Sequence, residues 1–327
     1  MSKVLIAPAA FFRVPGPYVR LLQEAGLEVV YPPAADPRSE ADTLSCLQGV
    51  SAIIAGGEFL NEKLLSQLPD LRVIARAGVG YDRVDIPAAT QRNIAVTITP
   101  NANHESVAEH ALGLLLALSR NIVGHHQDVL VGDWSRRPMV PLRGMTLGLV
   151  GLGRIGRSVA VRAQAFRLRV IAHDRFVDPE LAKRLNVELV DLPTLLAQSD
   201  YVSLHAPMTE STSGLINRQT LAQMKPGSFL INTSRGGLVV EEDLAAALQS
   251  GHLAGAALDV FEVEPTPVTN PLLKSPNLIL TPHLASGDYQ SMEDMGTESA
   301  TNIIALFRGG WPEGAVVNAQ IRPTFRW

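Results

Sequence analysis

The sequence predicts an α/β protein in which two doubly wound parallel sheets form two domains. Three observations lead to this fold class. Short apolar runs rich in β-branched residues alternate with amphipathic segments along most of the chain. The length of 327 residues exceeds that of an ordinary single domain, and a hydrophobic fraction of 46% can fill more than one core. A glycine-rich turn of the kind that follows the first strand of a doubly wound domain occurs only at residues 149–160.

Residues 1–102 contain five apolar runs that we expect to be strands. Amphipathic segments at 17–26 and 61–68 lie between them and have helical spacing. Strands that alternate with helices form parallel sheets with both faces covered, so these residues predict a complete small domain. The expected strands are 3–8, 27–32, 51–56, 71–78 and 94–99.

The alternation of strands and helices restarts after a long apolar helix that is expected at 103–122. It continues to about residue 285, and a second long helix at 291–310 follows with no strand partner. A helix without its own strand suggests that the chain returns to the first domain. We therefore expect residues 103–286 to form a domain inserted into one built from 1–102 and 287–327. The expected strands of the inserted domain are 146–151, 169–174, 187–191, 200–206, 228–234, 255–261 and 277–283.

Composition and charge exclude several classes of function. The formal net charge of −4 gives no basic field for nucleic acid or for an anionic membrane, whereas a small anionic substrate needs only a local cluster of cations. No apolar run reaches the roughly 18 residues of a membrane span. Cys46 is the only cysteine, so an internal disulfide framework and a cysteine-based metal cluster are both excluded. We expect a cytoplasmic protein without a metal site.

Gly151, Gly153 and Gly156 form a G-x-G-x-x-G pattern between an apolar run and a helical segment, which is typical of a Rossmann domain. The glycines allow a tight turn and a close approach of the backbone to a pyrophosphate, which the helix N-terminus then binds. The next expected strand ends at Asp174, whose carboxylate can bind both hydroxyls of an adenosine ribose and would repel a 2′-phosphate. The combination predicts NAD rather than NADP, although Arg175 could bind a 2′-phosphate. A glycine turn that only tightens packing is the alternative.

Three charged residues, Arg235, Glu264 and His283, each follow an expected strand of the inserted domain, at the edge where doubly wound sheets bind ligands. A guanidinium can bind a carboxylate and polarise a carbonyl group. An imidazolium can donate a proton to the carbonyl oxygen, and a carboxylate can hold the other ring nitrogen. These groups suit an enzyme that reduces a 2-oxo acid with a nicotinamide cofactor. Taken singly, each is as readily explained as a surface charge or a packed side chain.

A second pair of glycines, Gly78 and Gly80, follows an expected strand of the first domain. Backbone N–H groups around Val79 could bind a carboxylate, and a tight turn without a ligand is about equally consistent with the spacing. Arg76 precedes this loop. A phosphate site could use Arg76 together with Arg13 and the "DWSRRP" arginines Arg136 and Arg137, and surface salt bridges explain these arginines nearly as well.

The chain resembles the D-isomer-specific 2-hydroxyacid dehydrogenase family, near its D-3-phosphoglycerate dehydrogenase branch. The matching segments occur in the family's order over about residues 70–290, and several are long enough to be specific. They are "ARAGVGYDRVD", "SVAEHALGLLLALSRNI", "GLGRIGRSVA", "VSLHAPMTESTSGLI", "NTSRGGLVVEEDL", "ALDVFEVEP" and "LTPHLAS".

The resemblance implies a role for each matched residue. The family's fold is a Rossmann cofactor domain inserted into a flavodoxin-like catalytic domain. Arg235 matches the family's catalytic arginine, Glu264 its supporting acid and His283 its proton-donating histidine. The loop that binds the substrate carboxylate corresponds to Ala77, Gly78, Val79 and Gly80, with Arg76 before it. The implied NAD-binding residues are Gly151, Gly153, Arg154, Ile155, Gly156, Asp174, His205, Pro207, Thr212, Thr233 and Asp259.

The resemblance also implies NAD as the cofactor, a small anionic 2-hydroxy or 2-oxo acid as the substrate, and a homodimer formed through residues 121–145. The active site would lie in the cleft between the domains. We expect a short form of the phosphoglycerate branch, without the regulatory domains that some members add at the C-terminus. The first expected substrate is 3-phosphoglycerate, and the alternative is the reduction of glyoxylate or hydroxypyruvate. A nucleotide-sensing scaffold like the C-terminal-binding-protein corepressors, which share the fold, is an alternative of another class.

Overall fold

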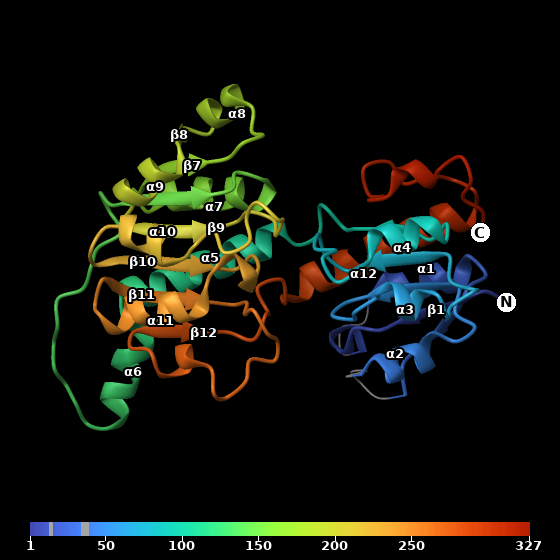
Figure 1. The fold of residues 1–327 in the computed structure, drawn as a ribbon, viewed down its shortest axis with the longest axis horizontal. Helices are drawn as coiled ribbons and strands as arrows, with labels where there is room; N and C mark the ends of the chain where they lie inside the picture. Colours follow the sequence, from blue (N-terminus) through green and yellow to red (C-terminus); the bar gives the residue numbers. More distant parts are fainter. Residues whose placement is uncertain (13–15, 34–38) are drawn as a thin grey trace. The chain divides into compact units, whose positions relative to one another are not determined.

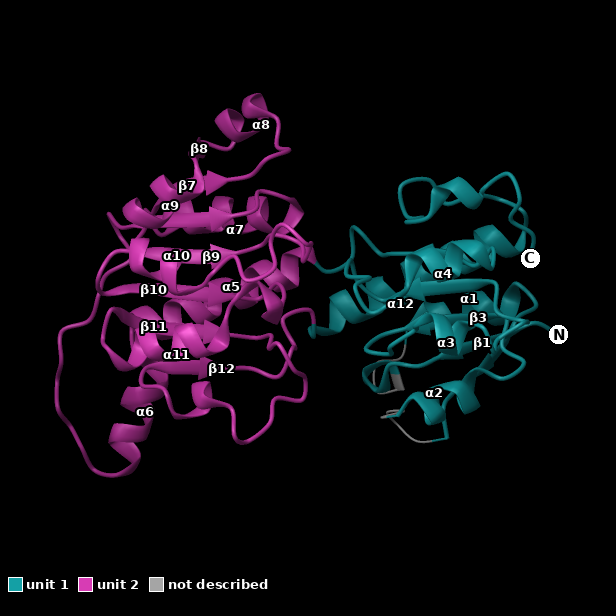
Figure 2. Cartoon of the chain, viewed as in Figure 1, with its two compact units in different colours: residues 1–103, 287–327 teal, residues 104–286 magenta. Residues whose placement is uncertain are grey.

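A computed structural model of the chain describes residues 1–12, 16–33 and 39–327 (Figure 1). Arg13 therefore lies outside the described residues. The chain divides into two compact units, which we call unit 1 and unit 2 (Figure 2). Unit 1 comprises Met1–Asn103 and Gly287–Trp327, and unit 2 comprises His104–Ser286. The sequence places the first boundary one residue earlier, after residue 102.

Unit 1 contains a five-stranded parallel sheet in the order β2-β1-β3-β4-β5. All five expected strands are present, and each is shorter than the apolar run that predicts it. The central residues of every strand except the edge strand β2 are almost completely buried because helices cover both faces of the sheet. The strands are β1 Lys3–Ile6, β2 Glu28–Val30, β3 Ala52–Ala55, β4 Val73–Arg76 and β5 Ala95–Thr97.

The two faces of the unit 1 sheet carry separate hydrophobic clusters. Helix α12, which follows unit 2 in the chain, packs with α1 on one face, and α3 and α4 pack on the other. Several helices begin at a side chain that accepts a backbone N–H of the first turn, such as Asp85 and Asp288. The helices are α1 Pro17–Glu24, α2 Glu40–Leu47, α3 Glu62–Leu65, α4 Ile86–Gln91 and α12 Tyr289–Phe307, with short 3-10 helices η1 Ala9–Phe12 and η4 Ala319–Ile321.

Unit 2 contains a seven-stranded parallel sheet in the order β12-β11-β10-β9-β6-β7-β8. Each expected strand of the inserted domain is present. The two sheets confirm the predicted fold class. Because all strands of unit 2 run in the same direction, their carboxyl ends lie along one edge of the sheet. The strands are β6 Thr146–Val150, β7 Arg169–His173, β8 Glu188–Leu189, β9 Tyr201–Leu204, β10 Ser228–Asn232, β11 Leu253–Leu258 and β12 Leu278–Leu280.

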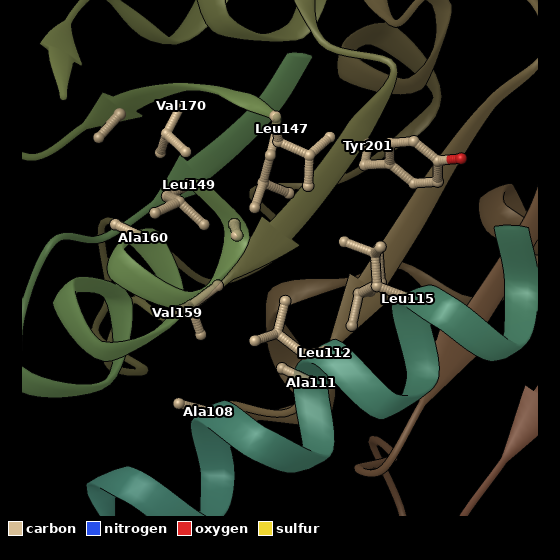
Figure 3. Close-up of a cluster of buried hydrophobic side chains, with 14 of the residues drawn as sticks. Ala108, Ala111, Leu112, Leu115, Leu147, Leu149, Val159, Ala160, Val170 and Tyr201 are labelled. Carbon is tan, nitrogen blue, oxygen red and sulfur yellow. The ribbon is translucent and has the colours of Figure 1, made fainter. Parts of the chain in front are cut away.

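Helix α5 packs against helix α7 and against strands β10 and β11. Figure 3 shows its small and branched side chains facing those of β6 and α7, all of them buried. This packing fixes α5 beside the sheet. The helices of unit 2 are α5 His104–Ser119, α6 Ile122–Leu130, α7 Arg154–Ala165, α8 Pro179–Arg184, α9 Leu192–Gln198, α10 Arg218–Gln223 and α11 Glu241–Gln249, with 3-10 helices η2 Gly236–Leu238 and η3 Pro271–Lys274.

Within residues 1–12, 16–33 and 39–327, no helix combines the length and the apolar character that crossing a membrane requires.

Candidate active site

The glycine turn joins the end of β6 to the start of α7. Gly151 has a φ of +100°, which disfavours a side chain, and a Cβ there would lie 2.7 Å from the carbonyl carbon of His205. A Cβ at Gly156 would overlap the carbonyl oxygen of Gly151. Gly153 is the N-cap of α7, is exposed and has open space where a Cβ would be. The N-terminus of α7 thus faces open space with no capping side chain, as an anion site requires.

Asp174 lies directly after β7, beside the glycine turn. Its carboxylate accepts hydrogen bonds from the backbone N–H groups of Leu152 at 2.7 Å, Phe176 at 2.8 Å and Val177 at 3.1 Å. The bond from Leu152 fixes the Asp174 carboxylate against the glycine turn, and the other two fix it to the backbone that follows β7. The predicted neighbours Arg154 and Ile155 form the first turn of α7, with Arg154 exposed.

The segment after β9 contributes a partly buried histidine. His205 Nε2 lies 2.9 Å from Ser203 Oγ, and Nδ1 is buried without a hydrogen-bond partner in the described part of the chain. Although part of the residue reaches the surface, burial of the ring lowers its pKa to about 4. The imidazole is therefore neutral at physiological pH. Pro207 and Thr212 lie in the exposed turn that follows, where Thr212 Oγ1 donates to Pro207 O at 2.7 Å.

The lowered pKa of His205 predicts a pH dependence of stability. Because the unfolded chain binds a proton near the ordinary pKa of 6.5 and the folded chain only near 4, the unfolded state gains protons as the pH falls between these values. The free energy of unfolding should fall over this range, by up to about 3 kcal/mol from this residue. Chemical denaturation at pH 7.5 and pH 5 should show a smaller loss in His205→Gln than in the wild type. His126→Gln, at an exposed position, should lose as much as the wild type. Equal losses in the wild type and His205→Gln would contradict the expectation.

Glu264 and His283 form the central pair of the site. His283 Nδ1 lies 2.8 Å from Glu264 Oε2, and Glu264 Oε1 accepts the backbone N–H of Phe261 at 3.0 Å. The glutamate side chain is 18% exposed and the histidine side chain 47% exposed. The carboxylate therefore holds one ring nitrogen, while Nε2 is left for a reacting molecule. This is the arrangement of an oriented general acid or base.

The backbone of His283 has a φ of +51°, in the left-handed region that few residues other than glycine and asparagine adopt. The fold must hold this conformation, and Asp259 does so. The main-chain oxygen of Asp259 accepts the N–H of His283 at 2.8 Å, and its fully buried carboxylate accepts those of Leu284 at 3.0 Å and Ala285 at 2.9 Å. The structure thus shows Asp259 fixing the turn that carries His283; its predicted contact with the cofactor stays a prediction.

Arg235 directly precedes the 3-10 helix η2 at the carboxyl end of β10. Asn232 Nδ2 donates to its main-chain oxygen at 2.8 Å, and its own guanidinium donates to Ser234 O at 2.7 Å. The next residue, Gly236, lies so close to the segment that leads to Glu264 that a Cβ would overlap the backbone of Phe261 and Glu262. This contact brings Arg235 and the Glu264 segment together. Thr233, two residues before Arg235, has a buried Oγ1 with no hydrogen-bond partner among the described residues.

Glu241 is a residue of this site that the sequence analysis missed. It lies in the first turn of α11 and is 91% buried, with Oε1 accepting the N–H of Glu262 at 2.8 Å and Oε2 accepting Asn270 Nδ2. It therefore fixes the irregular segment 261–270, which contains Glu264. An acid in the first turn of a helix is ordinary, so the sequence contains no signal that separates Glu241 from its neighbours.

The predicted substrate loop, residues 77–80, follows β4 of unit 1. Gly78 has a φ of +133°, and its N–H donates to Thr99 Oγ1 at 2.8 Å. Within the described part of the chain, the N–H groups of Val79 and Gly80 have no acceptor. Arg76 is buried, and its Nε donates to Gly80 O at 3.0 Å, so it stabilises the loop from beneath. Ala77 continues the strand pairing through its bond to Ala55 O.

The residues of unit 2 that the sequence predicts thus lie along one edge of one sheet. The glycine turn follows β6, and Asp174 follows the neighbouring strand β7. Arg235 follows β10, two strands from β6, and the paired Glu264 and His283 follow β11 and β12 beyond it. The buried Oγ1 of Thr233 and Nδ1 of His205 add polar atoms that an extended polar ligand could satisfy. This edge can bind an anionic cofactor and can deliver a proton at His283 Nε2.

Comparisons with known proteins agree with this arrangement. Residues 112–285 match the family model described as D-isomer specific 2-hydroxyacid dehydrogenase, NAD binding domain. A solved structure of similar fold is that of the TT0316 protein from Thermus thermophilus, with a TM-score of 0.86 and 37% identity, covering 96% of this chain and 99% of that one.

Two curated relatives carry different names. A D-3-phosphoglycerate dehydrogenase of Archaeoglobus fulgidus is 41% identical over 267 residues, which is 81% of this chain and 51% of the relative. The chain thus spans about half the length of that relative. A glyoxylate reductase of Thermofilum pendens is 39% identical over 318 residues, which is 94% of this chain and 93% of the relative.

Proposed function

Because the chain belongs to the D-isomer-specific 2-hydroxyacid dehydrogenase family, we propose that it transfers a hydride between NAD and a small 2-hydroxy acid or 2-oxo acid. The observation that supports this most directly is the 2.8 Å contact between Glu264 and His283, at the same sheet edge as the glycine turn. A carboxylate that orients a solvent-accessible imidazole allows that imidazole to act as a general acid or base toward a substrate oxygen.

The residues of unit 2 fit NAD. The glycine turn leaves the N-terminus of α7 open for a pyrophosphate, and Asp174 beside it is an acceptor for ribose hydroxyls. Thr233 Oγ1 and His205 Nδ1 are polar atoms that lack a protein partner among the described residues. When bound, the reduced nicotinamide supplies the hydride that the carbonyl carbon of a 2-oxo acid accepts.

In the reductive direction, three side chains of unit 2 take part. Arg235 binds the substrate carboxylate and polarises the carbonyl group, because its planar guanidinium can contact two oxygens. His283 Nε2 donates a proton to the carbonyl oxygen, and Glu264 holds the ring in position through Nδ1. Within unit 1, the backbone N–H groups of Val79 and Gly80 are proposed as donors that can bind a carboxylate. In the oxidative direction, His283 accepts the proton.

Asp174 is expected to determine the preference for NAD over NADP. Asp174→Asn keeps one of the two oxygen acceptors of the side chain and removes the negative charge, so the repulsion of a 2′-phosphate disappears. The ratio of kcat/KM for NADH to that for NADPH should fall by roughly ten- to a hundred-fold, as expected for loss of a charged hydrogen-bond partner. Steady-state assays with both cofactors measure this ratio. Asp178→Asn, at the N-cap of α8, is the matched control and should leave the ratio as it is. An unchanged ratio in Asp174→Asn would mean that the ribose binds elsewhere.

For the substrate, we propose an unphosphorylated 2-oxo acid of the glyoxylate or hydroxypyruvate type. A phosphate would need further cations, and the guanidinium of Arg76, the first candidate, lies buried beneath Gly80. The neighbouring strand β3 leads to Glu58, a nearly buried carboxylate that accepts the N–H of Gly56 at 2.6 Å. Its negative charge at this edge disfavours a second anionic group.

3-Phosphoglycerate is the second candidate, because the exposed Arg136 and Arg137 could supply the missing cations. If they bind a phosphate, Arg136→Ala should raise KM for phosphoglycerate at least ten-fold and leave KM for glyoxylate unchanged. Steady-state kinetics with both acids check this. Arg143→Ala, at another exposed arginine of unit 2, should change neither value. Equal values of KM in Arg136→Ala and wild type would remove this support for the phosphorylated substrate.

The experiment that tests the proposed function is a spectrophotometric screen for NADH oxidation and NAD reduction with phosphorylated and unphosphorylated acids. Steady turnover with at least one of them supports the proposal. Absence of turnover with the whole panel, while NADH still binds and quenches protein fluorescence, would overturn the enzymatic function and favour a nucleotide-sensing scaffold.

We also propose that the protein forms a homodimer through residues 121–145. Helix α6 in this segment has no buried residue. Apolar side chains are exposed along the helix and the loop after it, among them Leu130 at 66%, Val131 at 82% and Trp134 at 75%. Such a cluster is expected where a second copy covers it. A sedimentation mass equal to that of one chain would contradict this assembly.

A further inference from the structure

Helix α5 reaches the turn that carries His283 through two side chains, one helical turn apart. Ser106 Oγ donates to Ala285 O at 2.8 Å, in a bond that is fully buried. His110 Nε2 lies 3.0 Å from Thr281 Oγ1. None of these contacts involves a residue that the proposed reaction uses directly. Both ends of the turn, residues 281 and 285, are therefore tied to the same helix.

The contacts around Thr281 define the direction of each hydrogen bond. Thr281 Oγ1 lies 2.6 Å from Asp259 Oδ1, a carboxylate oxygen that can only accept, so the hydroxyl proton points toward Asp259. The hydroxyl oxygen can then only accept from His110, whose Nε2 must carry a proton. His110 Nε2 also lies 3.6 Å from Asp259 Oδ1. His110, Thr281 and Asp259 thus form an ordered series of donors and acceptors.

The series ends at the backbone of the turn. Asp259, which is 0% exposed, accepts the N–H groups of His283, Leu284 and Ala285 through its main-chain oxygen and its carboxylate. Those three residues include the left-handed His283, a conformation that costs free energy unless its surroundings impose it. The carboxylate is held by three donors, Thr281 Oγ1 and the N–H groups of Leu284 and Ala285, so loss of the Thr281 bond weakens the restraint on its orientation.

We propose that His110 is a positioning residue for His283: by donating to Thr281 it orients the Asp259 carboxylate, which holds the turn in the conformation that places His283 against Glu264. The inference rests on the proposed function for its kinetic test. Helix α5, itself packed against α7 and the sheet, is the rigid element to which the turn is attached.

The test compares His110→Phe, which removes the donor, with His110→Gln, which keeps an N–H donor. His110→Phe is expected to lower kcat by about ten- to a hundred-fold, as for loss of an outer hydrogen-bond partner of an active-site group, with KM for NADH within about two-fold of wild type. His110→Gln should retain most of kcat. Thr281→Val, which breaks the same series at its next member, should reproduce the loss, and Thr281→Ser should not.

The double variant His110→Phe/Thr281→Val should be no slower than Thr281→Val alone, because both changes break one series. His252→Phe is the matched control: it removes another partly buried histidine bond of unit 2, from Nε2 to Leu221 O at 2.9 Å. It should lower thermal stability and leave kcat unchanged. If His252→Phe lowers kcat as much as His110→Phe, or if His110→Gln is as slow as His110→Phe, the positioning role is excluded.

A spectroscopic readout separates this inference from the proposed reaction. In the wild type, the Nδ1 proton of His283 should give a low-field NMR signal because it is bound to Glu264. The signal should broaden or disappear in His110→Phe and Thr281→Val and persist in His110→Gln and His252→Phe. If the wild type shows the signal but no turnover, the proposed function fails and the positioning role is still tested. If the signal is unchanged in His110→Phe and Thr281→Val, the positioning role fails whatever the activity.

Discussion

His283→Ala is expected to slow turnover by roughly two to four decades, the contribution of a positioned general acid or base. The variant removes the proton that Nε2 would donate and the ring that Glu264 holds through Nδ1. Binding of NADH, measured by fluorescence titration, should be within a few-fold of wild type, because the glycine turn and Asp174 belong to other strands of the sheet.

The backbone at residue 283 requires a second variant. Alanine disfavours the φ of +51°, so part of the effect of His283→Ala could come from a displaced turn. His283→Asn avoids this problem because asparagine tolerates the left-handed region, yet it cannot act as an acid near neutral pH. Both variants should be slow to the same degree. Turnover of His283→Asn near the wild-type rate would show that the imidazole is not the proton donor.

Gly236→Ala is expected to reduce kcat at least a hundred-fold and to lower the free energy of unfolding by about 1–3 kcal/mol, as overpacking does. The added Cβ would overlap backbone atoms of Phe261 and Glu262, which cannot rotate away as a side chain can. The segment must shift as a whole. That shift moves Glu264, whose carboxylate is fixed by the N–H of Phe261, and Arg235, which directly precedes the substitution.

The neighbouring glycine is the matched control for this prediction. A Cβ at Gly237 would meet only the end of the Met208 side chain, with Cε at 2.8 Å, and that side chain can adopt another rotamer. Gly237→Ala should therefore keep most of the activity and stability. Measuring the thermal unfolding and kcat of both variants tests whether only Gly236→Ala loses activity and stability. Similar behaviour of the two variants would mean that the contact with Phe261 and Glu262 does not fix the site.

The arrangement of strands and the strand-end residues could be predicted from the sequence because both depend on local patterns. Buried parallel strands give continuous apolar runs, and their carboxyl ends share an edge, so Arg235, Glu264 and His283 could be grouped without coordinates. The pairing of Glu264 with His283 is a contact between neighbouring segments at that edge, and the structure shows it.

The supporting residues could not be predicted, because their roles come from contacts that are distant in sequence. His110 and Thr281 are 171 positions apart, and nothing in the apolar helix around His110 marks it as different from a packed histidine. Arg76 shows the opposite case. Its position at the end of a strand predicts a ligand-binding cation, which stays a prediction; what the sequence does not show is that its Nε donates to Gly80 O within the loop. A sequence pattern gives the position of a side chain along an element but not the surroundings that determine its use.

The bond between Ser106 and Ala285 also has a consequence for how such a chain can arise. It joins the third residue of unit 2 to its penultimate residue, so the unit begins and ends at neighbouring points. A domain whose two ends lie close together can be inserted into a loop of another protein at a small entropic cost. The inserted domain holds the two halves of that loop close together, as they were before the insertion. The gene for such a chain could therefore have been assembled by one recombination event that placed a complete domain inside another.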